Sequence, residues 1–292
     1  GAVASGFLGV DGVDVVILYP SGKVSEVQEK QLTTLGQNIK ALEVNCTFDD
    51  CQAMVKTAFL DSELISKRNL TSANSINVAR WLPQMFYFFF AYKQLQNKKQ
   101  KLVFSVPSGN FGNICAAAMA QKLGLPIKQL VASTNVNDIV PNYLETGIYT
   151  PKPSKQTISN AMDVGDPSNF IRIQEIYNND DTLLKKNLSS YSFTDKETKK
   201  AMRKIKKISG GYVADPHGAV GYLGLKKYLK NKRAQGIFLE TAHPVKFLDV
   251  VEPVLNESIE YPQQIKNVID RKKISIKIST YKELKDYLVT TK

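Results

Sequence analysis

The sequence has 292 residues, of which 43% are hydrophobic and 23% are charged, and its net charge is +12. This composition excludes a disordered chain, and no apolar run approaches the roughly 20 residues that a membrane-spanning helix needs. The excess of Lys and Arg attracts anions in general, but much of it lies in Lys-rich runs typical of solvated helix faces. We therefore expect neither a membrane nor a nucleic acid as partner.

Cysteines and histidines are too few for two further kinds of site. The three cysteines are Cys46, Cys51 and Cys115, and no two of them form a C-x-x-C pair. The histidines are His217 and His243. A disulfide framework and a zinc or multi-histidine metal site are therefore not expected. The cysteine usage favours a reducing compartment, and we predict a cytoplasmic protein with no metal.

The first 72 residues indicate a small α/β lobe. A β-branched apolar run at 14–19 ends at a Pro-Ser-Gly turn, which is typical of a strand buried on both faces. A helix is expected over 25–35 and a second strand over 39–44. The sequence Thr-Phe-Asp-Asp at 47–50 is a capping-box variant that opens a helix to about residue 60. The chain starts within a helix that lacks its cap, so we expect it to continue a longer protein whose N-terminal part is absent.

The next segment predicts a βαβ unit. A long aromatic helix over 76–96 precedes an apolar strand over 101–106. The strand runs into the Gly-rich turn at 107–113, an Ala-rich helix over 114–123 and a strand over 127–132. Strand, turn, helix and strand in this order are typical of parallel sheets.

The remaining chain completes a larger domain, assigned to residues 73–292. Residues 135–190 are expected to be irregular, and a loop that long usually has a function. A full capping box at 194–197 starts a Lys-rich helix, and a helix over 219–229 precedes a short strand over 236–240. The polar tail from 261 is expected to be a helical extension. The fold class is α/β, with doubly wound, mostly parallel sheets in two lobes.

The turn Ser-Gly-Asn-Phe-Gly-Asn at 108–113 is the sharpest local signal. It lies between a buried strand and a helix, so its N–H groups would point outward at the positive end of the helix dipole. Gly109 and Gly112 permit positive φ angles and a close approach of the backbone to an anion. The spacing fits neither a Walker loop nor a dinucleotide fingerprint. The turn is either a phosphate site or a plain connection.

A second group of polar side chains lies at the mouth of the aromatic helix. The sequence at 74–80 is Asn-Ser-Ile-Asn-Val-Ala-Arg. Asn74 or Ser75 is a good N-cap, and Arg80 lies about one and a half turns into the helix. The segment is either a cap with a surface arginine or a second anion site, toward which Arg80 reaches back.

Seven segments taken together resemble the threonine synthase family, whose members are pyridoxal-phosphate enzymes with the fold of the tryptophan synthase β subunit (fold type II). They span nearly the whole chain and follow the family order. The segments are Ala-Val-Ala-Ser-Gly-Phe at 2–7, the stretches at 74–80 and 106–113, Ser-Thr-Asn-Val-Asn-Asp at 133–138, Ser-Asn-Ala-Met-Asp-Val-Gly at 159–165, Asp-Pro-His-Gly-Ala-Val at 215–220 and Glu-Thr-Ala-His-Pro-Val-Lys-Phe at 240–247.

The resemblance implies a reaction and two sets of binding residues. O-phospho-L-homoserine and water would give L-threonine and phosphate, with pyridoxal 5'-phosphate as electron sink. The cofactor residues would be Ser108, Gly109, Asn110, Phe111, Gly112, Asn113 and, facing the pyridine nitrogen, Thr241. The substrate phosphate would be bound by Asn74, Ser75, Arg80 and Asn113. The protein would be a monomer or a homodimer.

The family's Schiff-base lysine has no counterpart here, because its segment lies N-terminal to every matching stretch. We therefore expect no catalytic lysine in this chain and no activity of the chain alone. Two other functions stay open from the sequence. The chain could be a non-catalytic protein of the same fold that binds phosphorylated ligands or a partner. It could also bind nucleic acid, with an affinity that falls steeply as salt rises.

Overall fold

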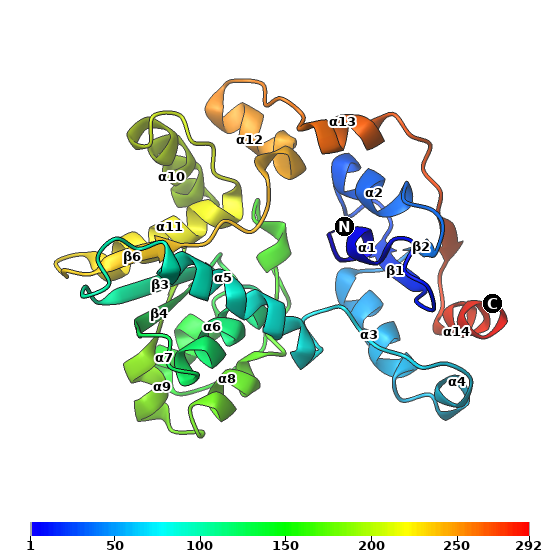
Figure 1. The fold of residues 1–292 in the computed structure, drawn as a ribbon, viewed down its shortest axis with the longest axis horizontal. Coiled ribbons are helices and arrows are strands. Elements are labelled where there is room, and N and C mark those ends of the chain that lie inside the picture. Colours follow the sequence, from blue (N-terminus) through cyan, green and yellow to red (C-terminus); the bar gives the residue numbers. More distant parts are fainter. Residues whose placement is uncertain (1, 292) are drawn as a thin grey trace. The chain divides into compact units, whose positions relative to one another are not determined.

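The computed structural model describes residues 2–291 and divides into two compact units (Figure 1). The first unit contains the residues up to Ser72 and those from Glu260 onward, and the second contains Ala73–Ile259. The segment from residue 260 was expected in the larger domain. This expectation is wrong, because strand β7 (Ile276–Ile278) pairs with strand β2 (Ile39–Val44) of the first unit.

The first unit is built on a parallel sheet with the strand order β1-β2-β7. Its other elements are α1 (Ala2–Phe7), β1 (Val15–Pro20), α2 (Glu26–Thr33), α3 (Phe48–Ala58), α4 (Ser62–Lys67), α13 (Gln263–Ile269) and α14 (Tyr281–Thr290). Capping boxes start α2, α3 and α14, as the Thr47 box predicted for α3. Leu42, Val44, Ile278 and Leu284 form the centre of its core.

The second unit holds a four-stranded parallel sheet with the order β5-β4-β3-β6. Its elements are η1 (Val78–Arg80), α5 (Trp81–Lys93), β3 (Leu102–Pro107), α6 (Gly112–Lys122), β4 (Ile127–Thr134), α7 (Ile139–Thr146), η2 (Asn160–Met162), α8 (Phe170–Ile176), α9 (Asp181–Asn187), β5 (Leu188–Ser192), α10 (Asp195–Ile208), α11 (Pro216–Leu229), β6 (Gln235–Phe238), η3 (Pro244–Phe247) and α12 (Leu248–Leu255). Parallel sheets in both units confirm the predicted α/β class.

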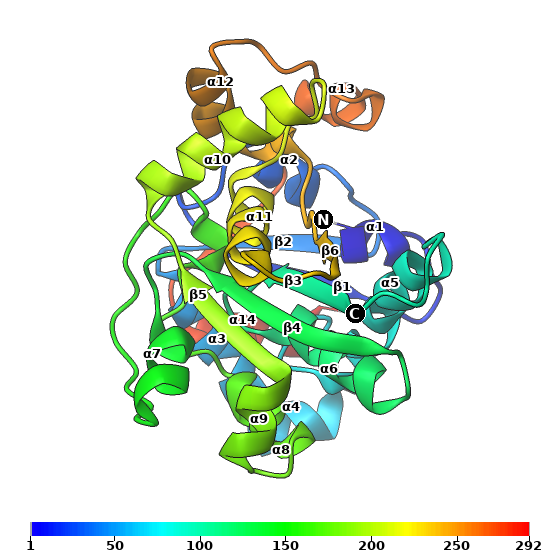
Figure 2. The ribbon, with the colours of Figure 1, turned by 90° about the vertical axis from the view of Figure 1, so that its left-hand side faces the viewer.

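Helices cover both faces of this sheet. Helix α6 packs on one face and α11 on the other (Figures 1 and 2). Strand β3 is buried along its whole length, as a strand with both faces covered must be. Helix α11 approaches the sheet closely at Gly224, where a Cβ atom would lie 1.8 Å from Ser133 Oγ. Ser133 Oγ is itself 2.8 Å from Ser105 Oγ, so the two strands and the helix meet in a buried polar contact.

Two stretches differ from the sequence analysis. Residues 135–190, expected to be irregular, contain α7, α8, α9 and strand β5, whose short apolar runs are packed by tertiary contacts. The long aromatic helix starts as the 3-10 turn η1, and Asn77 rather than Asn74 or Ser75 accepts the capping hydrogen bond from Ala79 N. A turn of this kind tightens the chain before the regular helix begins.

None of the helices in residues 2–291 has both the length and the apolar character required to cross a lipid bilayer.

Candidate active site

The turn between β3 and α6 presents unused backbone N–H groups. Ser108 is fixed at its start, since its N–H donates to Ser133 O at 2.8 Å and its Oγ donates to Val106 O at 2.8 Å. Within residues 2–291, no side chain caps α6, and its first turn contains no acidic residue. The N–H groups of that first turn therefore have no side-chain acceptor within the described residues, and the positive end of the helix dipole would favour an anion there.

The backbone angles of the turn differ from the prediction. The positive φ angle lies at Phe111, at 63°, and not at either glycine. A left-handed residue with a side chain costs about 1–2 kcal/mol. Phe111 is only 3% exposed and packs edge-on against Phe170, at 6.0 Å between ring centroids. Burial of the aromatic ring thus offsets the strain, and the glycines have another role.

Gly109 and Gly112 allow other segments to touch the turn. A Cβ atom on Gly109 would lie 2.6 Å from Met162 Cα, and a Cβ atom on Gly112 would lie 2.8 Å from Ser75 Cβ. Both distances are too short for a real side chain. The predicted close approach at these glycines therefore brings protein segments to the turn: residues 159–163 at one end and residues 74–76 at the other.

Asn110 joins three segments at the turn. Its Nδ2 donates to Ser75 Oγ at 3.0 Å, and its Oδ1 accepts from Ser168 N at 2.7 Å. Its carbonyl oxygen accepts from Asn169 Nδ2 at 2.9 Å. The structure thus brings Ser75, predicted for the substrate, to the loop predicted for the cofactor. The side chain of Asn113 projects from the same helix start, and its buried Oδ1 has no hydrogen-bond partner among the described residues.

Arg172 belongs to this cluster and was not predicted. Its guanidinium donates to Ser75 O at 3.4 Å, to Ile76 O at 2.8 Å and to Asn169 Oδ1 at 3.0 Å. It also lies over the ring of Trp81, at 5.3 Å from the centroid. The sequence offers only a weak signal for it, an arginine three residues after Asn169 in an Asn-rich stretch. Arg172 fixes the backbone of the 74–76 segment and adds a positive charge beside it.

The Arg80 guanidinium contacts the backbone at the start of its own segment. Its Nη1 donates to Ala73 O at 2.5 Å. Asn74 accepts at Oδ1 from Ser75 N at 2.6 Å. These residues and the turn belong to one unit, and Ser75 links them to it. The arrangement places two guanidinium groups, Arg80 and Arg172, near the backbone of residues 73–76.

Thr241 lies in a different hollow of the same unit. It is exposed and lines a groove of about 640 Å³. The groove is lined by Tyr212, Val213, Glu240, Thr241, Ala242, His243, Pro244 and Ile259. Residues 108–113 do not line it.

Buried hydrogen bonds connect the start of α11 to the segment that packs on the turn at 108–113. Asp215 Oδ1 accepts from His217 N and from His217 Nδ1, each at 2.7 Å. His217 Nε2 accepts from Ala161 N at 3.2 Å. Because Nε2 is an acceptor, the proton of this neutral imidazole lies on Nδ1. The histidine is thus structural, because it links the start of α11 to the 159–163 segment that packs against Gly109.

That segment is anchored at the end of β4 as well. Asn135 Nδ2 donates to Asp163 Oδ1 at 2.8 Å and to Thr157 Oγ1 at 2.9 Å. Thr157 N donates to Asp163 Oδ2 at 3.0 Å. Burial raises the pKa of Asp163, and the hydrogen bonds from Thr157 and Asn135 oppose that rise. This polar cluster holds the loop that packs on the turn.

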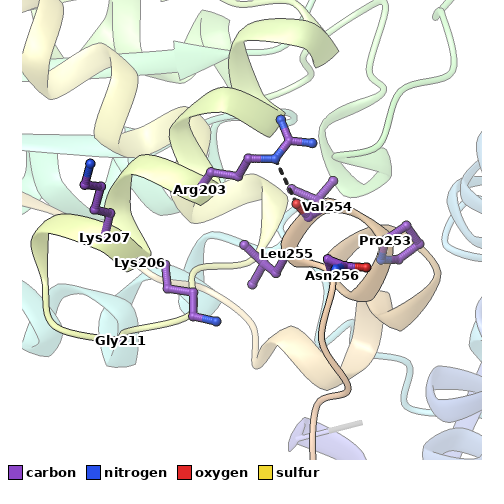
Figure 3. Close-up of a pocket in the computed structure, with 8 residues that line it drawn as sticks. All are labelled: Arg203, Lys206, Lys207, Gly211, Pro253, Val254, Leu255 and Asn256. Atoms are coloured by element: carbon purple, nitrogen blue, oxygen red, sulfur yellow. Dashed lines mark hydrogen bonds between the residues drawn. The ribbon is translucent and has the colours of Figure 1, made fainter.

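A second cavity of about 500 Å³ lies between α10 and the end of α12 (Figure 3). Its lining is basic on the α10 side, and none of the predicted site residues belongs to it. Arg203 Nε donates to Val254 O at 2.9 Å, and Lys206 forms an ion pair with Glu257. These two cations therefore connect α10 to the end of α12.

Known protein families match most of the chain. A family model described as pyridoxal-phosphate dependent enzyme matches residues 2–238, and one described as threonine synthase, C-terminal, matches residues 218–288. The threonine synthase of Buchnera aphidicola subsp. Acyrthosiphon pisum is 44% identical over 290 residues, which are 99% of this chain and 67% of the relative. The threonine synthase of Escherichia coli K12 is 46% identical over 265 residues, which are 90% of this chain and 61% of the relative.

Solved structures agree with the sequences. The crystal structure of threonine synthase from Escherichia coli superposes with a TM-score of 0.90 at 42% identity, over 98% of this chain and 67% of that one. A threonine synthase from Brucella melitensis, described as bound to PLP, gives 0.87 at 33% identity, over 99% and 67%. This chain thus spans roughly two thirds of the length of these proteins. It belongs to the pyridoxal-phosphate-dependent enzymes and, among them, to the threonine synthase family.

Proposed function

We propose that the protein containing this chain is a carbon–oxygen lyase that converts O-phospho-L-homoserine and water to L-threonine and phosphate with pyridoxal 5'-phosphate. The observation that carries the proposal is the uncapped start of α6 in contact with the Ser75 segment. Two binding places for anions meet there. A phosphorylated cofactor and a phosphorylated substrate would supply two such groups.

The turn at Ser108–Asn113 would hold the cofactor phosphate. The first-turn N–H groups and the helix dipole supply donors and positive potential, and no carboxylate in that turn opposes them. The residues present therefore fit a phosphate group at this place. Asn113 Oδ1 is buried and has no partner among residues 2–291; because it is an acceptor, a donor group of the bound substrate, and not the phosphate, would satisfy it.

Asn74, Ser75 and Arg80 would bind the substrate phosphate. The Arg80 guanidinium is permanently charged and offers a planar pair of donors to a dianion. Arg172 would keep the segment in place through its bonds to Ser75 O and Ile76 O, so that binding needs no large rearrangement. Asn113 lies at the junction of the two sites and would contact either ligand.

Thr241 would face the pyridine nitrogen of the cofactor. When bound, the cofactor accepts the electron pairs released at Cα and then at Cβ of the substrate, which lets phosphate leave from Cγ and water add at Cβ. A hydroxyl group at Thr241 is neutral and accepts or donates a hydrogen bond without holding a proton on that nitrogen. Free thiols at Cys46, Cys51 and Cys115 support a reducing, cytoplasmic location.

Release of inorganic phosphate from O-phospho-L-homoserine tests the proposal. We would measure it with pyridoxal phosphate present, for this chain and for the complete product of its gene, side by side. Phosphate and threonine formed in equal amounts by the complete product are expected. A complete product that is folded and holds the cofactor but releases no phosphate would contradict the proposed reaction. The fold assignment would not be affected.

The chain alone is the second arm of that experiment. Activity of the complete product only would agree with a catalytic lysine outside this chain. Activity of this chain by itself would contradict that view and place the lysine within residues 1–292. Binding of a phosphorylated ligand without turnover in either form would favour the non-catalytic alternative.

A further inference from the structure

The surroundings of Thr241 contain two carboxyl groups, the buried Asp215 and the partly buried Glu240, that the proposed reaction does not use. Asp215 is 0% exposed. Its Oδ1 accepts two hydrogen bonds from His217, whereas its Oδ2 has no partner among the described residues. Glu240, the residue before Thr241, has a buried Oε1 that also lacks a partner in residues 2–291. Each group thus has one oxygen that needs a hydrogen-bond partner.

A glycine makes room for the second carboxyl group. A Cβ atom on Gly218 would lie 2.0 Å from Glu240 Oε2 and 2.2 Å from its Oε1. The Glu240 carboxyl therefore occupies the space that a side chain would take at the first turn of α11. Asp215 is the N-cap of that helix, so the two carboxyl groups are held on the same turn.

Two carboxyl groups held at the same helix turn disfavour each other's ionisation. Asp215 is the acidic neighbour that acts on Glu240. Burial and the neighbouring Asp215 raise the pKa of Glu240 well above its ordinary range. The other titratable groups nearby are His217, neutral as argued above, Tyr212, and His243 of the same groove. A single proton on the pair would satisfy both unpaired oxygens.

We propose that Glu240 is a positioning residue whose carboxyl proton, shared with Asp215, holds Thr241 in place relative to the turn at Gly109. Glu240 and Asp215 both lie at the first turn of α11. From Asp215 the contacts run through the His217 ring to Ala161 N, and from that segment to Gly109. Its functional part rests on the function proposed above. The protonation of the pair does not, so the two can be tested separately.

Unfolding by urea between pH 5 and pH 9 tests the proton. Glu240 gains a proton on folding, so its stabilising contribution is complete below its ordinary pKa of 4.5 and is lost as pH rises toward the raised value. We expect the unfolding constant of the complete wild-type protein, divided by that of Glu240→Gln, to rise by up to about tenfold per pH unit. Glu145→Gln, at an exposed position, is the matched control.

Parallel pH curves for the wild type and Glu240→Gln would overturn the shared proton. If Glu240→Gln does not fold, the wild type itself provides the test by infrared spectroscopy with ¹³C-labelled glutamate. A band of a protonated glutamic acid at pH 7 is expected. Its absence would overturn the proposal equally.

Two alanine substitutions on α11 test the geometry. Gly218→Ala should push the Glu240 carboxyl out of its space and abolish the pH slope, without changing any ionisable group. Gly221→Ala should keep the slope, because the nearest atom to its Cβ would be at 3.4 Å, an ordinary contact. The same slope in both variants would contradict the placement of the carboxyl group.

Cofactor dissociation tests the positioning role. The wild type should release pyridoxal phosphate at least tenfold faster at pH 9 than at pH 7, whereas Glu240→Gln should show little change. Equal pH dependence in both proteins would overturn the positioning role even if the proton is found. A complete product that never binds the cofactor would refute the proposed function and this role together, and the unfolding and infrared data would still decide on the proton.

Discussion

The two ends of the candidate cofactor site are built on different physical principles. At the turn between β3 and α6, close backbone contacts at Gly109 and Gly112 and the amide of Asn110 fix the geometry, and none of these groups titrates. Beside Thr241, the proposed fixed point is the carboxyl pair of the buried Asp215 and the partly buried Glu240. We therefore expect the turn end to be insensitive to pH, whereas the Thr241 end should depend on one proton.

Removal of Asp215 should break the Thr241 end most severely. Asp215→Ala deletes the N-cap of α11 and the partner of the His217 ring, which together stabilise the fold by about 3 kcal/mol or more. Urea unfolding at pH 7 measures the loss. Asp215→Asn keeps an oxygen for both bonds and should cost clearly less. Equal losses in the two variants would mean that the cap and the ring contact are unimportant.

Gly112→Val should break the turn end. The added Cβ would meet Ser75 Cβ at 2.8 Å, and overpacking of this kind costs about 1–3 kcal/mol. We expect cofactor affinity to fall by about ten- to a hundredfold, with the same loss at pH 7 and at pH 9. Equilibrium dialysis against pyridoxal phosphate at both pH values is the measurement. A loss that changes with pH would contradict the division between the two ends.

Arg172→Met sharpens the comparison within the turn end. Three hydrogen bonds from one guanidinium disappear, and the free energy of unfolding should drop by about 1.5–3 kcal/mol. The KM for the phosphorylated substrate should rise as well, because the segment of Ser75 loses its support. Arg172→Lys restores the charge but not the planar set of donors, so rescue by lysine would speak against the geometric role.

Arg80→Ala should have the smallest effect on the fold and a selective effect on the substrate. The side chain is partly exposed, and its bond to Ala73 O is local. We expect KM to rise by roughly tenfold or more, with little change in cofactor retention. Steady-state kinetics beside a cofactor-release assay separate the two. Equal loss of cofactor in Arg80→Ala and Gly112→Val would refute two distinct anion sites.

Local signals made the turn predictable from the sequence. The strand over 102–107, the two glycines and the Ala-rich helix are contiguous, and hydrophobic period and turn chemistry act over such short ranges. The exception is Phe111, whose left-handed backbone depends on the distant ring of Phe170. A glycine was expected to adopt that angle. Phe111 adopts it instead, because the packing of its ring stabilises the left-handed backbone.

Distant partners explain what the sequence analysis missed. Arg172 is 97 residues from Ser75, and Glu240 meets Asp215 across a whole helix and a strand. Strand β7 lies in an alternating Ile-Ser-Ile-Lys-Ile stretch at 274–278, a local strand signal within the tail that was expected to be helical, and its pairing with β2 assigns it to the first unit. For Arg172 and Glu240 the deciding contact is made by residues far apart in sequence, and no local pattern indicates it.

The place of β7 in the first sheet sets the order in which the protein can be completed. Ser275 Oγ donates to Glu43 Oε2, a contact between residues 232 positions apart in sequence. A ribosome adds about 5–20 residues per second, so β2 would wait on the order of ten to fifty seconds for its last neighbour. Throughout that time the edge of β2 is unpaired and open to other strands. The growing chain is therefore exposed to mispairing at this edge while most of the residues between β2 and β7 are being synthesised.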